Sequence, residues 1–224
     1  MIYFTLVIYV TRVYVIRHPE TDGNAKKIFQ GHIDLDVNEL GKKQLAALKE
    51  RFENINIDAV YTSPLLRTRR TAEAVVGCRN IPIIPHEGLI ELNGGVYEAK
   101  TFFQIGEEYP DFPDIWSNHP WDFAPRNGEK MTDAYNRIWK TVKNIVCENK
   151  GKDIAVTTHG GVIRCLMCRL FKNDITKLTE IPFMYNTSVS LLEFDGKMNV
   201  NVVYFNDYSH LTDDLKNTSA EVPK

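Results

Sequence analysis

The sequence has few cysteines, no excess of charge of one sign and no apolar run long enough for a membrane helix. Its four cysteines are too few for the disulfide framework of a secreted protein, and 224 residues can bury a core without such links. Lys and Arg number 27 against 29 Asp and Glu, so the net charge of −2 gives no general attraction to nucleic acid or anionic lipid. These properties predict a cytoplasmic protein without nucleic-acid or membrane partners, in which local arginines would have to bind any anion.

The apolar residues 1–10 need a separate interpretation. They have neither the basic region nor the small-residue cleavage site of a signal peptide, and Arg12 interrupts the run. We expect residues 1–10 to be an N-terminal appendage, residues 11–208 to form a single domain and residues 209–224 to form a polar tail. The pair Cys165 and Cys168 has no second Cys or His pair at the spacing of a zinc site, so both thiols are expected in the core or on a helix face.

Strand-like and helix-like segments alternate along the chain. Short apolar, β-branched runs predict strands at 12–16, 57–62, 81–85 and 153–158. Apolar residues spaced three and four apart predict helices at 38–54, 65–76, 131–148 and about 162–171. Segments 188–194 and 200–205, joined around Asp195-Gly196, predict a β-hairpin. This order predicts an α/β three-layer sandwich, with a mostly parallel mixed sheet flanked by helices.

The segment 93–130 breaks this alternation. It contains four prolines and two tryptophans and is too long for a plain connection. We therefore expect an insertion, packed over the C-terminal ends of the strands, where a lid or a wall of a substrate pocket would lie.

Three of the predicted strands run directly into polar residues. The first runs into Arg17-His18, the second into Ser63-Pro64 with Arg67 close behind, and the fourth into His159-Gly160-Gly161. Ligands of open α/β sheets bind at the carboxyl ends of the strands. If these three strands are neighbours, two histidines and two arginines meet at one place, together with the N-termini of helices.

This set of residues is suited to phosphoryl chemistry. Arg17 and Arg67 offer planar guanidinium groups that match phosphoryl oxygens, and helix N-termini favour anions. A histidine between two arginines is disfavoured in its protonated form, which leaves a free ring nitrogen as a nucleophile. A carboxylic acid would supply the proton for the leaving oxygen, and Glu20, Glu91 and Glu98 are the candidates. No Asp-rich cluster or His-x-His pair indicates a metal, so no metal or other cofactor is expected.

The same motifs resemble those of the histidine phosphatase superfamily, the phosphoglycerate mutase-like enzymes. The resemblance covers residues 12 to 204, and the motifs occur in the family's order. They are Arg17-His18-Pro19-Glu20-Thr21 with Asn24, Gln30-Gly31-His32, Thr62-Ser63-Pro64-Leu65-Leu66-Arg67, Leu89-Ile90-Glu91-Leu92, and Thr158-His159-Gly160-Gly161-Val162-Ile163-Arg164. One departure is Pro19, where the family usually has glycine; proline has no N–H group and a fixed φ.

The resemblance implies roles for individual residues. His18 would be the nucleophile that becomes phosphohistidine, and Glu91 would be the proton donor. Arg17, Arg67 and His159 would hold the phosphoryl group, with help from the substrate-binding residues Asn24, Gln30, Gly31 and Gly160.

Other residues have ordinary structural interpretations. Lys26 and Lys27 are expected in a solvated loop, and Trp116 and Trp121 are expected to pack the insertion. Arg126 and Arg164 could serve as substrate contacts or as structural residues. Surface or loop positions are expected for the remaining histidines, His32, His86, His119 and His210.

The function predicted is a metal-independent phosphatase for small phosphate monoesters, similar to the broad-specificity members of the superfamily. The partner would be a small phosphorylated metabolite, and the protein would be a monomer or a homodimer. One alternative is a cofactor-dependent phosphoglycerate mutase. The insertion holds Lys100, Arg126 and Lys130 but no adjacent pair of arginines, which argues against it. A non-catalytic protein that binds phosphorylated ligands is the third alternative.

Overall fold

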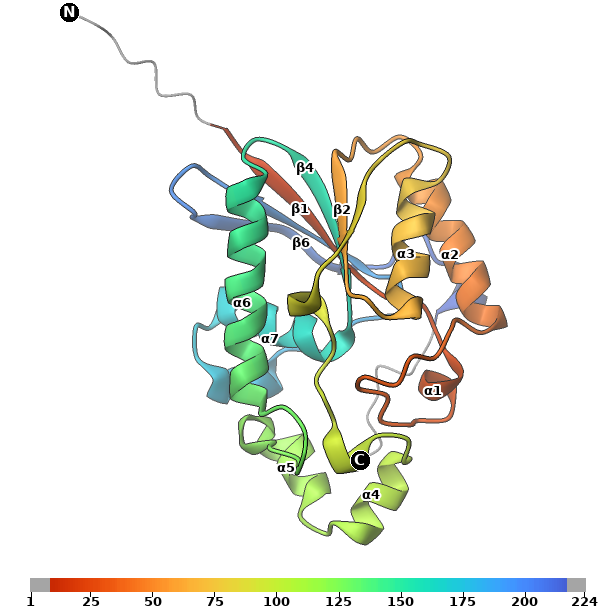
Figure 1. The fold of residues 1–224 in the computed structure, drawn as a ribbon, viewed down its shortest axis with the longest axis vertical. Helices are drawn as coiled ribbons and strands as arrows, with labels where there is room; N and C mark the ends of the chain where they lie inside the picture. Colours follow the sequence, from red (N-terminus) through yellow and green to blue (C-terminus); the bar gives the residue numbers. More distant parts are fainter. Residues whose placement is uncertain (1–8, 217–224) are drawn as a thin grey trace, which may run out of the picture.

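The computed structural model describes residues 9–216 (Figure 1). Residues 1–8 of the expected N-terminal appendage and residues 217–224 of the expected tail lie outside this range. None of the helices within it is both long and apolar enough to cross a membrane.

A six-stranded mixed sheet forms the centre of the molecule, with strand order β3-β2-β4-β1-β5-β6. The strands are β1 (Thr11–Arg17), β2 (Ala59–Thr62), β3 (Ile83–Pro85), β4 (Asp153–Thr158), β5 (Val189–Phe194) and β6 (Val200–Asp207). Strands β3, β2, β4 and β1 are parallel, whereas β5 and β6 are antiparallel to their neighbours. The three strands with polar ends, β2, β4 and β1, are thus adjacent and parallel, as the predicted site requires.

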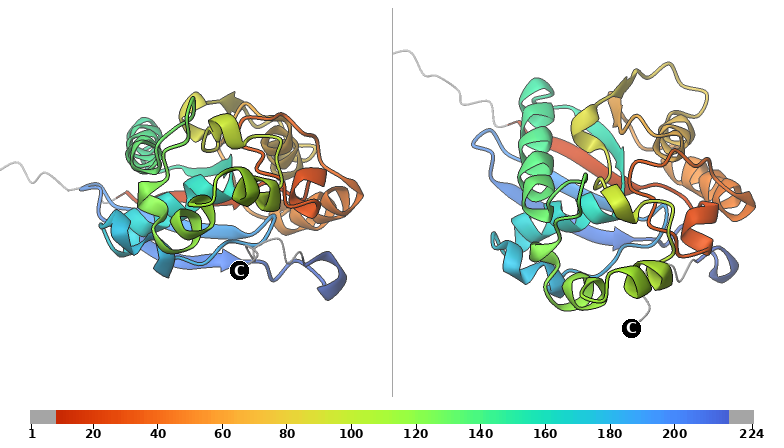
Figure 2. Two further views of the ribbon diagram at one scale, coloured as in Figure 1. Left: turned by 90° about the horizontal axis from the view of Figure 1, so that it is seen from below. Right: turned by 60° about the horizontal axis from the view of Figure 1, so that its bottom comes forward.

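Helices cover both faces of the sheet, which confirms the predicted three-layer sandwich (Figures 1 and 2). Alternate residues of β1 divide between the two sides, as the period of a strand dictates. Tyr14 and Ile16 belong to the core cluster with α2 (Glu39–Phe52) and α3 (Leu66–Val76). Val13 and Val15 belong to the cluster with α6 (Met131–Glu148) and α7 (Gly160–Phe171).

Most boundaries agree with the predicted ones, but α7 begins at Gly160 rather than at about Val162. Glycine has low helix propensity, so the sequence pattern does not reveal this first turn. The turn is stabilised from outside, because the carboxylate of Glu91 accepts hydrogen bonds from the N–H groups of Gly161 and Val162. A residue of the predicted site therefore also caps this helix.

The expected insertion lies at the carboxyl ends of the parallel strands, below the sheet in Figure 1. It consists of η2 (Gly95–Tyr97), α4 (Phe102–Glu108), α5 (Phe112–Asn118) and η3 (Pro120–Asp122). Aromatic ring contacts join it to Phe29, which is stacked on Phe123, meets Trp116 edge-to-face and has tilted contacts with Tyr97 and Phe102. The loop after β1 and the insertion thus share one aromatic cluster.

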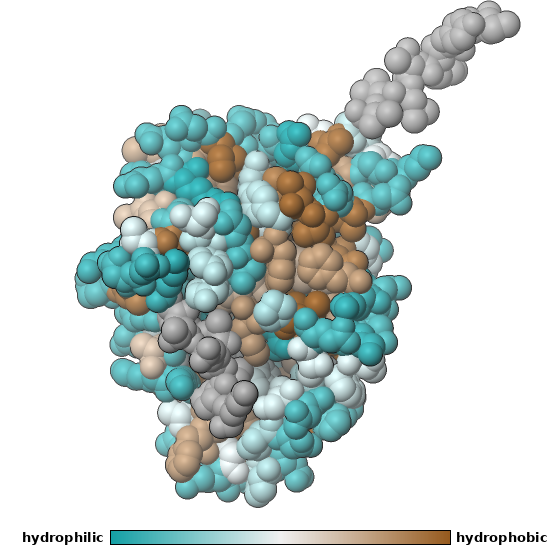
Figure 3. Space-filling model, turned by 180° about the vertical axis from the view of Figure 1, so that it is seen from behind, coloured by the Kyte–Doolittle hydropathy of each residue, from teal (hydrophilic) through white to brown (hydrophobic). Residues whose placement is uncertain are grey.

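The remaining helical elements are short. They are α1 (Asp22–Ala25), η1 (Glu87–Leu89), η4 (Ile175–Glu180) and η5 (Asp213–Leu215). The first of these follows the Arg17-His18 motif and begins with a capping box between Thr21 and Asn24. Seen from behind, the molecule presents apolar side chains between hydrophilic areas (Figure 3), on the side where the edge strand β6 runs in Figures 1 and 2.

Candidate active site

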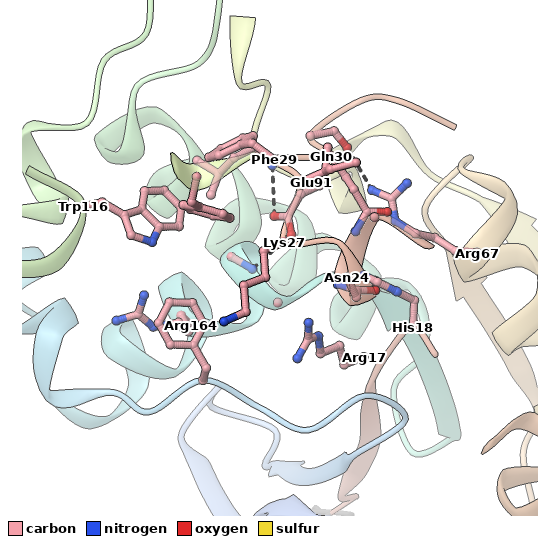
Figure 4. A pocket seen from close by; sticks show the side chains of 18 of the residues that line it. Arg17, His18, Asn24, Lys27, Phe29, Gln30, Arg67, Glu91, Trp116 and Arg164 are labelled. Atoms are coloured by element: carbon pink, nitrogen blue, oxygen red, sulfur yellow. Dashed lines mark hydrogen bonds between the residues drawn. The ribbon is translucent and has the colours of Figure 1, made fainter. Parts of the chain in front are cut away.

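A pocket lies where β1, β2 and β4 end, and it encloses a cavity of about 130 Å³ (Figure 4). Eight of the nine predicted site residues line it, namely Arg17, His18, Asn24, Gln30, Gly31, Arg67, Glu91 and Gly160. The ninth, His159, is completely buried, and its ring centroid lies 5.2 Å from that of His18. The parallel strands thus bring together residues that are up to 143 positions apart.

His18 is held in the form that a nucleophile requires. Its side chain is only 3% exposed, and burial together with the positive charges of Arg67 and Arg17 holds the pKa of the imidazole well below its ordinary value of 6.5. The Nδ1 atom lies 2.7 Å from the carbonyl oxygen of Pro19. Since a carbonyl oxygen can only accept, Nδ1 carries the proton and Nε2 keeps a free lone pair.

This contact also explains why proline is compatible with the motif. The group that orients the imidazole is the carbonyl of Pro19, which proline retains, and not the N–H group that it lacks. The main chain of His18 is fixed by other residues, since its N–H donates to Thr158 and its carbonyl accepts from the side chain of Asn186.

The two arginines are anchored through some of their nitrogens and keep others for a ligand. Arg17 donates Nη1 to the carbonyl of Met184, and Arg67 donates to the carbonyls of Ile33 and Gly31 at 2.7 and 2.8 Å. The Nε atoms of both are buried and have no acceptor among residues 9–216. Burial lowers the pKa of each guanidinium to about 10, so both remain positively charged at neutral pH.

Of the three carboxylates considered as proton donor, Glu91 alone lines the pocket. Its oxygens accept from the N–H groups of Gly161 and Val162 at 3.1 and 3.2 Å, at the N-terminus of α7. Glu98 accepts from two backbone N–H groups and Glu20 from the side chain of Asn38, so both have structural partners. His32 lies in a turn and is partly exposed, as expected, and its Nε2 lies 3.0 Å from the carbonyl oxygen of Glu91.

Ser63 is a residue whose role the sequence analysis missed. Its Oγ lies 2.7 Å from Nε2 of His159 and also accepts from the N–H of Leu65 at 3.4 Å. Burial and the neighbouring Arg67 and His18 hold the pKa of His159 well below 6.5, so its ring carries one proton. If the Ser63 hydroxyl donates to Nε2, that proton sits on Nδ1, a buried atom without a partner among the described residues. His159 can then donate to a ligand.

Three further side chains with N–H donors line the pocket, namely Lys27, Trp116 and Arg164. Lys27 is exposed in its loop, as expected, but its side chain also extends over the pocket (Figure 4), which the sequence analysis did not predict. Neighbouring residues in a loop have no periodicity, so the sequence could not distinguish it from Lys26. Trp116 packs in the aromatic cluster, as expected, and also forms a wall of the pocket.

The charge of the pocket is opposite to that of the whole chain. Four cationic side chains, Arg17, Lys27, Arg67 and Arg164, line it with the single carboxylate of Glu91. Residues 9–216 contain no group of three or more His, Cys, Asp or Glu side chains placed to hold a metal ion. The lining is suited to binding a small anion directly through guanidinium and backbone N–H groups.

Known proteins share this fold and resemble the chain in sequence. The solved structure of Bacillus stearothermophilus YhfR superposes with a TM-score of 0.85 at 35% identity, over 89% of this chain and 98% of that chain. The broad-specificity phosphatase YOR283W of Saccharomyces cerevisiae is 31% identical over 222 residues, which cover 92% of this chain and 93% of the yeast protein. Phosphoserine phosphatase 1 of Hydrogenobacter thermophilus is 26% identical over 200 residues, covering 89% of this chain and 94% of its own.

The model of one protein family matches residues 13–207, which include every motif of the pocket. The chain belongs to the histidine phosphatase superfamily, branch 1.

Proposed function

We propose that the protein is a metal-independent phosphatase that hydrolyses small phosphate monoesters through a phosphohistidine at His18. Its family and the phosphatases among its relatives make it a phosphoric monoester hydrolase. The observation that carries the mechanism is the neutral imidazole of His18, whose Nδ1 is bound to a carbonyl while two guanidinium groups lie beside the ring. Cytoplasmic location is part of the proposal, and it is supported by four free cysteines.

In the first step, Nε2 of His18 attacks phosphorus and the bond to the leaving oxygen breaks. Arg17 and Arg67 neutralise the phosphoryl oxygens, and the Nδ1–H of His159 donates to one of them. Glu91 transfers its proton to the leaving oxygen, so that an alcohol departs. The imidazole of His18 then carries the phosphoryl group on Nε2 and keeps its hydrogen bond to Pro19 through Nδ1.

In the second step, water attacks the phosphohistidine. The carboxylate of Glu91, now without its proton, takes one from the water, and inorganic phosphate leaves Nε2 of His18. The same carboxylate thus acts first as acid and then as base, which its place in the pocket wall allows.

The mutase alternative is less favoured. A mutase needs basic side chains to hold a phosphorylated carboxylic acid, and the sequence analysis named Lys100, Arg126 and Lys130 as candidates. None of the three lines the pocket, and Lys100 is paired with Glu108. The binding-protein alternative predicts a ligand without turnover, which a hydrolysis assay distinguishes.

The test is to mix the enzyme with p-nitrophenyl phosphate, quench in alkali and locate the phosphoryl group by mass spectrometry. We expect an acid-labile adduct on His18, and no release of p-nitrophenol by His18→Ala with its circular dichroism unchanged. The matched control is His119→Ala, at an exposed histidine outside the pocket, which should keep full activity. Turnover by His18→Ala, or a label on another residue, would contradict the mechanism.

A further inference from the structure

Two peptide units meet at Pro19, directly after the nucleophile where β1 ends (Figure 4). The first unit contains the carbonyl of His18. The second contains the carbonyl of Pro19, which accepts from Nδ1 of the His18 ring at 2.7 Å. The direction of this second carbonyl decides which ring nitrogen keeps a free lone pair, and residues far away in the sequence determine it.

The loop before β5 holds the first peptide unit. The side-chain amide of Asn186 donates to the carbonyl of His18 at 2.9 Å, and the N–H of Thr187 donates to the same oxygen at 3.4 Å. Both residues are completely buried. Thr187 has a φ of +57°, a left-handed conformation that a β-branched residue adopts only where its surroundings enforce it. The loop thus presents two donors to one carbonyl at the expense of a strained backbone.

Helix α2 holds the second peptide unit. The N–H group of this unit belongs to Glu20 and donates to Oε1 of Gln44 at 2.8 Å. Gln44 is completely buried, and its Nε2 donates to the carbonyl of Leu215 at 2.9 Å, so both ends of the amide are fixed. Because a peptide unit is planar, Gln44 sets the plane that contains the carbonyl of Pro19.

Pro19 links the two planes rigidly. Only φ and ψ of this residue separate them, and the proline ring locks φ at about −65°. A single hydrogen bond still lets its peptide plane tilt. With φ locked, however, a tilt of either plane must turn the carbonyl of Pro19 away from the ring of His18. Glycine at this position would absorb such a tilt by a change in φ.

We propose that Asn186 and Gln44 are positioning residues for the nucleophile. Through Pro19 they keep a carbonyl on Nδ1 of His18, so that the ring proton stays on Nδ1 and the lone pair of Nε2 is available to phosphorus. Without this acceptor a neutral imidazole can carry its proton on either nitrogen, and a ring protonated on Nε2 cannot attack. The inference rests on the proposed phosphohistidine mechanism.

The same loop also holds Arg17, so its effects on the two residues must be separated. Nη1 of Arg17 donates to the carbonyl of Met184, and its backbone N–H donates to Ser188 at 3.2 Å. A change that disturbs Arg17 weakens the binding of inorganic phosphate. A change of tautomer on His18 slows the attack on phosphorus and leaves phosphate binding unchanged.

The experiment uses Asn186→Leu and Gln44→Met, which keep the approximate size of each side chain and remove its amide. The readouts are kcat/KM for p-nitrophenyl phosphate, Ki for inorganic phosphate, and the nitrogen chemical shifts of the histidine rings in isotope-labelled enzyme. His18→Ala identifies the signals of His18. We expect each variant to lose about fivefold to tenfold in kcat/KM, the effect of one ordinary hydrogen bond, with an unchanged Ki. The two ring nitrogens should shift toward values averaged over both tautomers.

Pro19→Gly tests the link between the two amides. This variant should itself show mixed tautomers of His18, because φ is no longer locked. In its background, Asn186→Leu should cost at most about twofold more in kcat/KM, since both changes loosen one and the same carbonyl. If Asn186→Leu does not fold, Gln44→Met takes its place in the same cycle.

Asn149→Leu is the matched control. Asn149 is buried and its amide donates to the carbonyl of Ile145 at 2.8 Å, but it contacts Thr11 at the start of β1, the opposite end from the pocket. This variant should lose stability and keep the wild-type kcat/KM and ring shifts.

Three results would each overturn the proposal. They are wild-type kcat/KM and His18 shifts in Asn186→Leu and Gln44→Met, losses that add fully to that of Pro19→Gly, and a rise in Ki as large as the loss in kcat/KM. Failure of the proposed function would be recognised separately, because His18→Ala would then still hydrolyse p-nitrophenyl phosphate.

Discussion

The hydrogen bond between Ser63 and His159 leads to a prediction about the proton on His159. Ser63 is fully buried, and its hydroxyl is 2.7 Å from Nε2 of that ring. With the hydroxyl as donor, the ring proton is confined to Nδ1, where it can serve the phosphoryl oxygens. Ser63→Ala leaves Nε2 without this partner, so the proton can move to either nitrogen and only part of the population donates to the substrate.

The size of the effect follows from the bond that is lost. An unpaired buried polar group costs about 1–3 kcal/mol of unfolding free energy, and each kcal/mol lowers Tm by roughly 2–4 °C in a domain of this size. Removal of a complete transition-state donor typically costs about 10²–10³ in kcat. Because His159 itself remains, we expect Ser63→Ala to lose about tenfold to hundredfold in kcat, less than His159→Ala.

The assay is steady-state hydrolysis of p-nitrophenyl phosphate together with thermal unfolding. Ser190→Ala is the control. Like Ser63, Ser190 is buried and accepts a hydrogen bond from a backbone N–H group, that of Asn206. Ser190 lies on β5, however, and does not line the pocket. It should lose stability without losing kcat. In the His159→Ala background, Ser63→Ala should cost no further activity, since the two residues act through one hydrogen bond. A Ser63→Ala enzyme with wild-type kcat and a lower Tm would refute the reasoning and leave Ser63 a structural role.

Three more predictions concern the acid, the metal and pH. Glu91→Gln should slow alkyl phosphate hydrolysis by about 10²–10⁴, the usual contribution of a general acid. With p-nitrophenyl phosphate it should give a burst of p-nitrophenol, because the second step lacks its base. Rapid-quench kinetics without such a burst would contradict this role of Glu91. Activity should survive excess EDTA. If EDTA abolished the activity and added metal restored it, the mechanism in which arginines supply all of the positive charge would be excluded. The pKa values of His18 and His159 in the folded state are depressed, so below pH 6.5 the unfolded chain binds more protons than the folded chain. The stability that is present above pH 6.5, where both rings are neutral in either state, is therefore lost as the pH falls. Urea unfolding between pH 7 and 5.5 should detect a free energy of unfolding that falls with the pH, with a slope that approaches about 1.4 kcal/mol per pH unit for each histidine below pH 6.5, and a flat profile would argue against their burial as neutral rings.

The sequence was sufficient to predict the sheet and the phosphoryl side of the pocket. The apolar runs before Arg17, Ser63 and His159 are continuous, so their strands could be recognised and their ends located. Parallel neighbours necessarily end at the same edge of a sheet, and the structure places β2, β4 and β1 side by side. The position of these residues in the fold therefore follows from strand order and does not depend on loop conformation.

The part of the pocket lined by Lys27 and Trp116 could not be predicted in the same way. Lys27 lies in a loop with a left-handed backbone conformation, and Trp116 packs within an insertion. Neither effect has a periodic signal in the sequence. The role of Ser63 depends on one contact between side chains that are 96 positions apart, and the buried position of His159 depends on how α7 begins.

The contrast between total and local charge explains how a slightly acidic protein can bind a dianion. Charges on the surface are screened beyond about 8–10 Å at physiological ionic strength, so the net charge of −2 has little influence inside a pocket. Within the pocket, four cations and one carboxylate interact with a ligand over short distances, in surroundings with a lower dielectric constant than water. Most of the 29 acidic residues lie outside this lining. The ligand class therefore had to be inferred from the residues that follow the strands and not from the composition of the whole chain.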